Sequence, residues 1–435
     1  LSLGEGCTPL IRAVNLGMML GCPNIYIKDE RQGPTSSFKD RQAAVTIAAL
    51  KEAGITEMVA ASTGNVAISY SAYASRAGMK LWAFVTSLVP SVKMREIALY
   101  GSQVIKITGS YDQCKQVASE FARQRKLYQD MGARTITSIE AMKTIAFEIA
   151  EQLTAAQGPG EDTPWRTPVW DVQAISGGMG PIGVYKGFRE MRQMGWVDSI
   201  PSFAPIQAEG CAPMVNSWKK GLEKAEVVNS PKTRIETLAT GDPGRSYEFL
   251  RQIVNDTNGA FDSVSDADAF RAMHVLAKME GISAEPAAAV AFAGLFKLIR
   301  AGVIKPSDTV VVNCTGHTMP AEAGILGENW SRDVKFPSAD ETPQEGLLSA
   351  LTQVAPERFP KVAIVEDTTE ARRLIRRILQ SQGNFTILEA SNGREGLDLI
   401  QKELPDLVII DLMMPEMDGF TVIEALRAKQ ETAVI

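Results

Sequence analysis

Short strands rich in β-branched residues alternate with amphipathic helical segments along the first 330 residues of this 435-residue chain. Repeated strand-then-helix order predicts a parallel sheet covered by helices on both faces, so the expected fold class is α/β. The expected strands are residues 25–28, 58–61, 81–85, 104–107, 169–175, 205–209 and 309–314. The expected helices include residues 40–53, 66–77, 111–125, 143–155 and 182–194. Ligands bind beyond the carboxyl ends of such strands, where the Gly-rich and Ser/Thr-rich turns should gather.

A second α/β pattern begins near residue 361. It predicts strands at 361–365, 386–390 and 407–411 and helices at 371–382, 395–402 and 421–429. Residues 331–360 hold four prolines and one short helical pattern at 344–354, which is typical of a linker. Residues 1–330 carry 33 basic and 33 acidic side chains, whereas residues 361–435 carry 9 and 13. The sequence therefore predicts a domain at 1–330, a linker at 331–360 and a second domain at 361–435.

The two ends of the chain suggest a fragment. The chain does not begin with Met, and residues 432–435 resemble a new strand with nothing after it. We therefore expect the second domain to be incomplete at its carboxyl end.

Composition excludes several classes of function. The net charge is -6, with 45 basic and 51 acidic side chains, which argues against a general nucleic-acid binder. The longest nearly uncharged apolar stretch, residues 286–296, is far short of the roughly 18–20 residues that a membrane helix needs. Five widely spaced cysteines indicate reduced thiols in a cytoplasmic protein. Only two histidines occur, so proton chemistry falls to a lysine, a carboxylate or a cofactor.

Lys39 is the first candidate for that chemistry. It lies at the expected start of a helix, after the turn at residues 33–38. The positive end of the helix dipole disfavours a charged lysine there, but it suits a neutral amine that forms a Schiff base with an aldehyde. An isolated lysine of this kind is more often a solvated surface residue.

Three other turns also fit parts of a cofactor site. The turn at residues 62–65 offers hydroxyls and a helix N-terminus to a carboxylate, although it would equally serve as a plain helix cap. The turn at residues 176–183 has four glycines, which allow the backbone to wrap a phosphate. Thr315 ends a buried strand, where its hydroxyl would reach a pyridine nitrogen or simply close a turn.

Together these segments resemble the fold-type II family of pyridoxal-phosphate enzymes, and the threonine synthases within it. The family's lysine motif is matched by Pro-Thr-Ser-Ser-Phe-Lys-Asp-Arg at residues 34–41, and its Ser-Thr-Gly-Asn loop by residues 62–65. Its opening motif is matched by Gly-Glu-Gly-Cys-Thr-Pro-Leu at residues 4–10. Further matches lie at residues 207–210, 285–289 and 315–317. The resemblance implies two α/β lobes, similar to the tryptophan synthase β chain.

The resemblance also implies residue roles. Lys39 would bind pyridoxal 5'-phosphate as a Schiff base and transfer protons, Asn65 would hydrogen-bond the ring hydroxyl, and Thr315 would meet the ring nitrogen. The cofactor phosphate would be bound by the backbone of Gly177, Gly178, Met179 and Gly180. The substrate carboxylate would be held by Ser62, Thr63 and Gly64. A threonine at the ring nitrogen suits elimination or replacement better than transamination, because the ring is then a weaker electron sink.

A threonine synthase would convert O-phospho-L-homoserine and water to L-threonine and phosphate, as a cytoplasmic homodimer in threonine biosynthesis. Two positions depart from that pattern: Ser138 stands where these enzymes carry an arginine, and Met179 stands where asparagine is common. Both family residues help to bind the substrate phosphate, so we expect Lys93 and Lys143 to substitute in part. A threonine or serine dehydratase, or a β-replacement synthase, is the alternative enzyme.

The second domain has its own pattern of carboxylates. Glu366 and Asp367 end its first strand and Asp411 ends its third, a set of oxygen ligands that suits Mg²⁺. With the Met-Pro-Glu-Met-Asp-Gly turn at residues 414–419, this resembles a response-regulator receiver domain of the flavodoxin-like fold. The resemblance implies that Asp411 accepts a phosphoryl group from a histidine kinase or another phosphodonor, with the Met413 carbonyl as a further Mg²⁺ ligand. The receiver's switch Ser or Thr and its Lys would lie beyond residue 435.

An alternative function of a different class is that of a regulatory protein, in which the receiver carries the function and the larger domain is a degenerate binding module. Intact Lys39, Asn65 and Thr315 favour an enzyme instead.

Overall fold

The computed structural model describes residues 1–62, 64–86, 89, 91–108, 111–156, 164–317, 359–429, 432 and 435. Contacts divide the chain into two compact units, Leu1–Glu322 and Ala323–Ile435, and each is described by itself below. The helical pattern at 344–354 lies outside the described residues. Within the described ranges, no helix is long and apolar enough to cross a membrane.

The first unit contains a six-stranded sheet with the order β1-β2-β10-β7-β8-β9. Its strands are β1 (Leu10–Arg12), β2 (Ile25–Asp29), β7 (Trp170–Ala174), β8 (Ser202–Ala208), β9 (Asp262–Val264) and β10 (Val310–Cys314). All neighbours are parallel except β1, which runs antiparallel to β2. The prediction of a parallel α/β sheet is confirmed, whereas the three-residue strands β1 and β9 were too short to show a period in the sequence.

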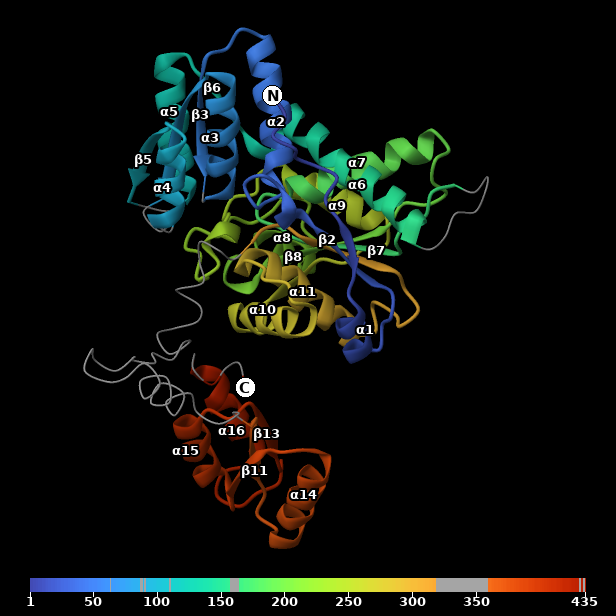
Figure 1. The fold of residues 1–435 in the computed structure, drawn as a ribbon. Coiled ribbons are helices and arrows are strands. Elements are labelled where there is room, and N and C mark those ends of the chain that lie inside the picture. The colour runs from blue at the N-terminus through green and yellow to red at the C-terminus, as the bar shows by residue number, and fades with distance from the viewer. Residues whose placement is uncertain are drawn as a thin grey trace, which may run out of the picture. The chain divides into compact units, whose positions relative to one another are not determined.

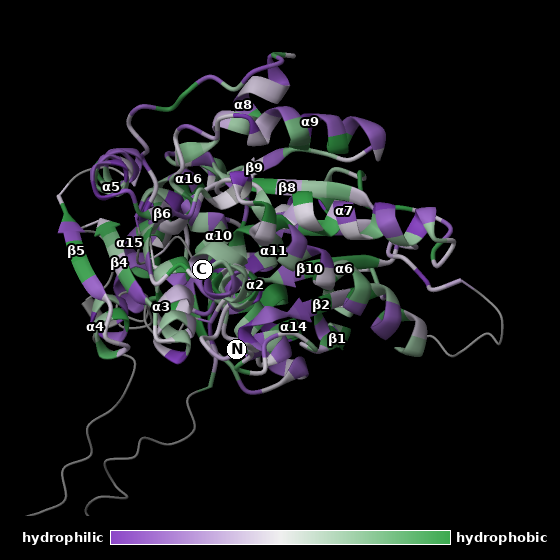
Figure 2. Ribbon diagram, turned by 90° about the horizontal axis from the view of Figure 1, so that it is seen from above, coloured by the Kyte–Doolittle hydropathy of each residue, from purple (hydrophilic) through white to green (hydrophobic). Residues whose placement is uncertain are grey.

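Helices cover both faces of this sheet. One face packs against α1 (Val14–Leu20), α10 (Asp266–Glu280) and α11 (Pro286–Arg300) through residues such as Ile27 and Val312. The other packs against α6 (Ile136–Ala156), α7 (Met179–Gln193), α8 (Pro213–Lys219) and α9 (Ser246–Asp256) through Tyr26, Val311 and Phe203. Hydrophobic and hydrophilic stretches alternate along α7 and α9 (Figure 2), as expected for helices with one buried side.

A smaller sheet forms the second lobe of this unit (Figure 1). It is wholly parallel and has the order β5-β4-β3-β6. Its strands are β3 (Glu57–Ser62), β4 (Lys80–Thr86), β5 (Gln103–Ile107) and β6 (Tyr128–Gln129). One face packs against α2 (Lys39–Glu52), α3 (Asn65–Ala77) and α4 (Ser91–Leu99), and the other against α5 (Tyr111–Arg125). Helix α6 contacts both α2 and α7 and so joins the two lobes.

The second unit has a three-stranded parallel sheet with the order β12-β11-β13. Its elements are β11 (Lys361–Val365), α14 (Thr369–Gln382), β12 (Thr386–Ala390), α15 (Gly393–Glu403), β13 (Leu407–Ile410) and α16 (Gly419–Ala428). Its core joins Val365 to Ile400 and Val422 from α15 and α16. Of the strand predicted at 432–435, residues 432 and 435 are described and neither is in a strand; the Thr432 hydroxyl instead donates to Leu426 O over 2.7 Å.

Candidate active site

Lys39 is the first residue of α2 and lies beside the end of β10, a strand of the other lobe. Phe38 N donates to Thr315 O over 3.1 Å, and Ser37 forms an antiparallel bridge with Gly316. These main-chain contacts hold the base of the lysine against the larger sheet. Two candidate residues that lie 276 positions apart in the sequence, Lys39 and Thr315, are therefore brought together.

The amine of Lys39 has an unusual environment. Within the described ranges Nζ has no hydrogen bond or ion pair, and it lies 4.1 Å from the centre of the Phe38 ring. Burial lowers the pKa of Lys39 to about 8, although the negative charges of Asp130 and Glu285 oppose that shift. A lysine with this pKa is partly neutral near pH 8, which is the form that attacks an aldehyde.

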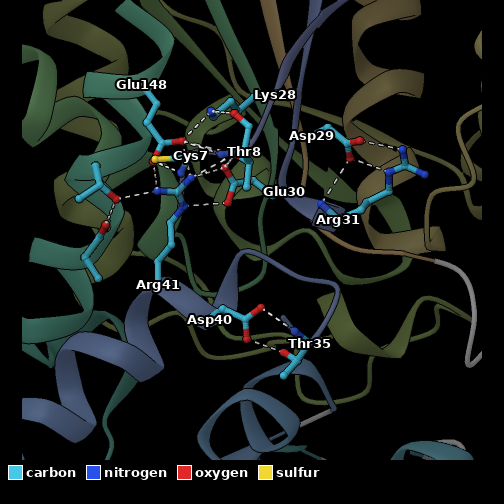
Figure 3. A network of polar contacts seen from close by, with 12 residues as sticks. Cys7, Thr8, Lys28, Asp29, Glu30, Arg31, Thr35, Asp40, Arg41 and Glu148 are labelled. Carbon is cyan, nitrogen blue, oxygen red and sulfur yellow. Dashed lines mark hydrogen bonds and ion pairs between the residues drawn. The ribbon is translucent and has the colours of Figure 1, made fainter. Parts of the chain in front are cut away.

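Arg41, two residues after Lys39, anchors α2 in a buried network (Figure 3). Its guanidinium contacts Glu30 at 2.8 Å and Glu148 at 2.6 Å, and Glu148 also accepts from Lys28 Nζ over 2.7 Å. Thr8 joins the network through a 2.7 Å bond to Glu30. The network ties α2 to β2 and α6, so the arginine of the lysine motif has a structural role in orienting the helix that carries Lys39.

Asn65, the first residue of α3, makes two close contacts with charged side chains. Lys93 Nζ donates to Asn65 Oδ1 over 2.7 Å, and Asn65 Nδ2 donates to Glu285 Oε1 over 2.8 Å. Lys93 Nζ also lies 3.4 Å from Glu285 Oε2, and the two side chains are only 5% and 7% exposed. A Cβ on Gly316 would lie 3.2 Å from Asn65 Nδ2, which places this group beside the end of β10.

The loop from β3 to α3 is organised by Ser62. Its Oγ accepts from Gly64 N over 3.0 Å and from Ala67 N over 3.1 Å, which caps the start of α3. The Ser62 hydroxyl hydrogen is left to donate, as binding of a carboxylate would require. Thr63 lies outside the described residues.

The glycine turn follows β7 and begins α7. Gly178 has φ +80°, and a Cβ there would overlap Leu250, while a Cβ on Gly180 would overlap the Gln173 amide. Residues 177–180 donate no described main-chain hydrogen bond through their N–H groups, and Pro181 has none to donate. The turn is therefore a set of backbone donors without described partners at a helix N-terminus, which is a typical phosphate-binding arrangement.

Two hydroxyl residues, Ser37 and Thr315, belong to the main-chain contact between the start of α2 and the end of β10. Thr315 is 5% exposed and Ser37 is 1% exposed, and neither side chain has a hydrogen-bond partner among the described residues. Buried hydroxyls without partners are uncommon in folded proteins, so these two are available to a bound molecule.

Lys143 has different surroundings. Its Nζ pairs with Glu140 at 2.6 Å and with Glu190 at 2.9 Å, in a partly exposed cluster on α6 and α7 that also contains Lys186. The ammonium therefore lies among the carboxylates of two helices, and its role toward a substrate stays a prediction. Ser138, where the resembling enzymes carry arginine, is fully buried and its Oγ has no described partner.

The sequence did not single out Asp130 or Arg134. Asp130 follows the two-residue strand β6, and burial raises its pKa although bonds from Tyr70 and the charge of Lys39 oppose that shift. Arg134 is exposed in the next turn, with no ion pair or hydrogen bond to its side chain in the described part of the chain. A Cβ on Gly244 would lie 3.5 Å from Arg134 Nη2. Strand β6 is too short to leave a readable pattern, so neither residue had a signal in the sequence.

In the second unit, Glu366, Asp367 and Asp411 come together as predicted from the strand ends. Ligand oxygens of all three lie within 4.8 Å of one another, and each residue is partly buried. Asp411 Oδ1 accepts from Met413 N over 3.1 Å, which bends the following turn toward the cluster. The donor set of three carboxylates suits a hard cation such as Mg²⁺.

Residues 1–316 match the family described as pyridoxal-phosphate dependent enzyme. The chain belongs to this family. Among its relatives, the threonine synthase of Methanocaldococcus jannaschii is 32% identical over 317 residues, which cover 73% of this chain and 75% of the relative. The threonine synthase of Mycobacterium tuberculosis is 33% identical over 319 residues, covering 73% and 82%. The fold-type II resemblance noted in the sequence is thereby confirmed.

Solved structures agree with the fold. Threonine deaminase isoform 2 from Solanum lycopersicum superposes with a TM-score of 0.61 at 19% identity, covering 73% of this chain and 80% of that one. Diaminopropionate ammonia lyase from Escherichia coli gives a TM-score of 0.63 at 17% identity, covering 75% and 88%. Residues 362–435 match the response regulator receiver domain, so this part of the second unit is a receiver.

The residues around Lys39 fit pyridoxal phosphate. An unpaired amine of lowered pKa, a turn of free backbone N–H groups and two unpaired hydroxyls match an aldehyde, a phosphate and a polar ring. The cofactor would be held by Lys39, the backbone of residues 177–180, Asn65 and Thr315.

Proposed function

We propose that the chain is a pyridoxal-phosphate dependent lyase that converts O-phospho-L-homoserine and water to L-threonine and phosphate. The observation that carries this proposal is the position of Lys39, whose amine of lowered pKa is held at the end of β10. Relatives that are threonine synthases at 32–33% identity support the choice of reaction within the family.

The chemistry divides between cofactor and chain. Bound pyridoxal phosphate would supply an electron sink for negative charge on the substrate carbon. Lys39 Nζ would move the proton at that carbon, since its pKa of about 8 lets it give and take a proton near neutral pH. Ser62 and Gly64 would hold the substrate carboxylate at the start of α3, where the helix dipole favours an anion.

The substrate phosphate needs a cation, and the lysines have other partners. Lys93 is bound to Asn65 and Glu285, and Lys143 is bound to Glu140 and Glu190. We infer that Arg134 receives the phosphate, because it is exposed without a described partner and it reaches Gly244.

The position of Gly244 supports this inference. It lies in the same loop as Thr240, whose hydroxyl is 2.5 Å from that of Ser176 beside the glycine turn. Arg134 thus extends from the smaller lobe toward the loop that borders the glycine turn, where the cofactor phosphate would bind. A guanidinium there would bind a phosphate through two hydrogen bonds.

A dehydratase acting on threonine or serine, or a β-replacement synthase, is the second candidate. Ser138 favours it, because it replaces an arginine that would bind a substrate phosphate. Assays with purified protein that follow phosphate release from O-phosphohomoserine, beside ammonia release from threonine and serine, separate the candidates. Ammonia release without phosphate release would refute the threonine synthase proposal.

The involvement of Lys39 has a separate test. Wild-type protein should show a cofactor absorbance band that borohydride fixes covalently, and Lys39→Ala should lack it. The same experiment tests the alternative that the larger domain is degenerate, since a chain without this band would not be an enzyme of this kind.

For the receiver, we propose that Asp411 is the phosphoacceptor and that Glu366, Asp367, Asp411 and the Met413 carbonyl bind Mg²⁺. The clustering of the three carboxylates supports this. A histidine kinase or another phosphodonor would supply the phosphoryl group. Acetyl phosphate with Mg²⁺ should label the wild type and not Asp411→Asn, and equal labelling of both would refute the assignment.

Phosphorylation would then regulate the enzyme to which the receiver is linked. A full-length protein whose turnover is unchanged when Asp411 is fully phosphorylated would contradict this.

We also propose that the protein is a cytoplasmic homodimer, with domains at 1–330 and 361–435 joined by a linker at 331–360. The five cysteines, none of them in a disulfide, agree with a reducing compartment.

A further inference from the structure

The partners of Asn65 fix the direction of its carboxamide. An ammonium group only donates hydrogen bonds and a carboxylate only accepts them. Lys93 Nζ therefore faces Asn65 Oδ1, and Glu285 Oε1 faces Asn65 Nδ2, at 2.7 and 2.8 Å. Glu285 uses one of the two hydrogens on Nδ2, and the other is left to donate to a third group. Without these two neighbours, the amide would be free to turn over and present an acceptor instead.

The three residues come from different elements and from both lobes. Asn65 begins α3 and Lys93 lies in α4, both in the smaller lobe. Glu285 precedes α11 in the larger lobe, and its main-chain N–H donates to Gly316 O over 3.1 Å. The ring of contacts therefore joins the start of α3 to the end of β10, the same strand end to which Phe38, next to Lys39, is bound.

The absence of a side chain at Gly64 leaves room for Lys93 to reach Asn65 and Glu285. A Cβ at that position would lie 3.0 Å from Lys93 Cδ, and Gly64 has φ +140°, which L side chains rarely adopt. The lysine stem thus lies directly over the loop before Asn65. Its position is set by the backbone, and the ammonium is directed at Asn65 and Glu285.

The charges of the ring are balanced. Glu285 is 5% exposed and its negative charge acts to raise the pKa of Lys39, so it lies close to the reactive amine. Lys93, 4% exposed, supplies the matching positive charge. Removal of Lys93 would leave the Glu285 carboxylate buried without an ion-pair partner, which is strongly unfavourable.

We propose that Lys93 and Glu285 are positioning residues that hold Asn65 as a hydrogen-bond donor to the ring oxygen of pyridoxal phosphate, and that Lys93 does not bind the substrate phosphate. This role differs from the one predicted for Lys93 from the sequence. The inference rests on the proposed function for the cofactor alone and does not depend on which reaction is catalysed.

The test is a titration of the full-length apo-protein with pyridoxal phosphate, for the wild type, Lys93→Met, Glu285→Gln and the double variant. Each single variant should raise the dissociation constant about tenfold or more, because a hydrogen bond in a charged, buried ring is lost. The double variant should bind more tightly than Lys93→Met alone, because it leaves no buried unpaired charge. Lys80→Met is the matched control: this half-exposed lysine pairs with Glu57 at 3.1 Å and should bind the cofactor like the wild type.

The absorbance spectrum of the bound cofactor gives a second readout, since the protonation of the ring oxygen depends on the donor opposite it. Both single variants should shift this spectrum, and a purely structural ion pair would not. If Lys93→Met does not fold, Glu285→Gln, which keeps the size of the side chain, carries the same test.

Wild-type cofactor affinity and an unchanged spectrum in Lys93→Met, together with a raised KM for O-phosphohomoserine, would overturn the proposal and make Lys93 a substrate ligand. The proposal would also be overturned if the dissociation constant of the double variant rose by the product of the two single-variant factors, because the two residues would then act independently. Failure of the proposed reaction looks different: the wild type would bind the cofactor and release no phosphate, and the titrations would keep their meaning.

Discussion

Replacing Glu148 with glutamine should destabilise the first unit by about 3–5 kcal/mol, because it removes one charge from a buried, neutral network. Both oxygens of Glu148 act only as acceptors. Oε1 accepts from Cys7 N at 2.9 Å and Arg41 Nη1 at 2.6 Å, and Oε2 accepts from Lys28 Nζ at 2.7 Å and Arg41 Nη2 at 2.7 Å. A glutamine must turn an NH₂ group toward one of these sets of donors. Lys28, which is fully buried, would also lose the negative charge of Glu148 that balances its ammonium.

The pKa of Glu148 gives an independent magnitude. Burial acts to raise it, but hydrogen bonds and charges from Arg41 and Lys28 more than offset that and lower the pKa from 4.5 to about 2. At about 1.36 kcal/mol for each pH unit, this difference corresponds to about 3 kcal/mol. The sign follows from the lowered pKa: the stabilisation is present above pH 4.5 and is lost as the pH falls toward 2.

The change in unfolding free energy can be measured by urea denaturation of the apo-protein, followed by tryptophan fluorescence, which reports on the part of the chain outside the receiver. The six tryptophans are at positions 82, 165, 170, 196, 218 and 330, and none lies in the receiver. The unfolding free energy of Glu148→Gln should fall by the stated amount at pH 7, and its deficit relative to the wild type should shrink between pH 4.5 and 2.

Glu140→Gln is the control, because Glu140 lies on the same helix in a partly exposed ion-pair cluster with Lys143 and Lys186. Exposed pairs contribute about 0–1 kcal/mol. If Glu148→Gln were no less stable than Glu140→Gln at pH 7, the assignment of the network as a main anchor of α2 would be refuted.

Four further outcomes are expected. Gly180→Ala should lower the unfolding free energy of the apo-protein by about 1–3 kcal/mol because its Cβ would overlap Gln173, whereas the same change at Gly177, where a Cβ meets nothing within 4 Å, should not. Ser36→Gly should raise that free energy by about 0.5–1 kcal/mol, since Ser36 has φ +57°; a urea midpoint at or below the wild-type value would contradict this. Arg134→Ala should raise KM for O-phosphohomoserine about 10- to 150-fold, and Arg134→Lys should restore part of the loss; an unchanged KM would exclude a phosphate contact. The rate of cofactor capture by the apo-protein should rise with pH and level off above about 8, because burial lowers the pKa of Lys39 from 10.5 to about 8; a rise that continues toward pH 10 would show an ordinary, solvated amine.

The sequence allowed prediction of those site residues that follow a strand and begin a helix. Lys39 and the glycine turn follow strands of the larger sheet, whose carboxyl ends meet at one edge, and Asn65 follows β3 in the smaller sheet. The same logic predicted that Glu366 and Asp411 would approach each other, although 45 positions separate them.

Other residues could not be predicted in this way. Lys93 and Glu285 are 192 positions apart, and neither follows a strand directly, so their contact depends on how the two lobes pack. Asp130 comes after a strand of only two residues, which is too short to show alternation. The sequence predicted that residues 62–65 would fit a helix cap as well as a carboxylate site, but which main-chain groups donate to Ser62 Oγ depends on the path of the loop.

The attachment of Lys39 to β10 is made by main-chain atoms, through Phe38 N and Thr315 O. A main-chain contact of this kind does not depend on which side chains occupy positions 38 and 315. Variants that exchange those side chains would keep the lysine in register, whereas a deletion or insertion of a single residue between the end of β2 and α2 would move it out of reach. In engineering this scaffold, the length of that turn is therefore a stricter constraint than its composition.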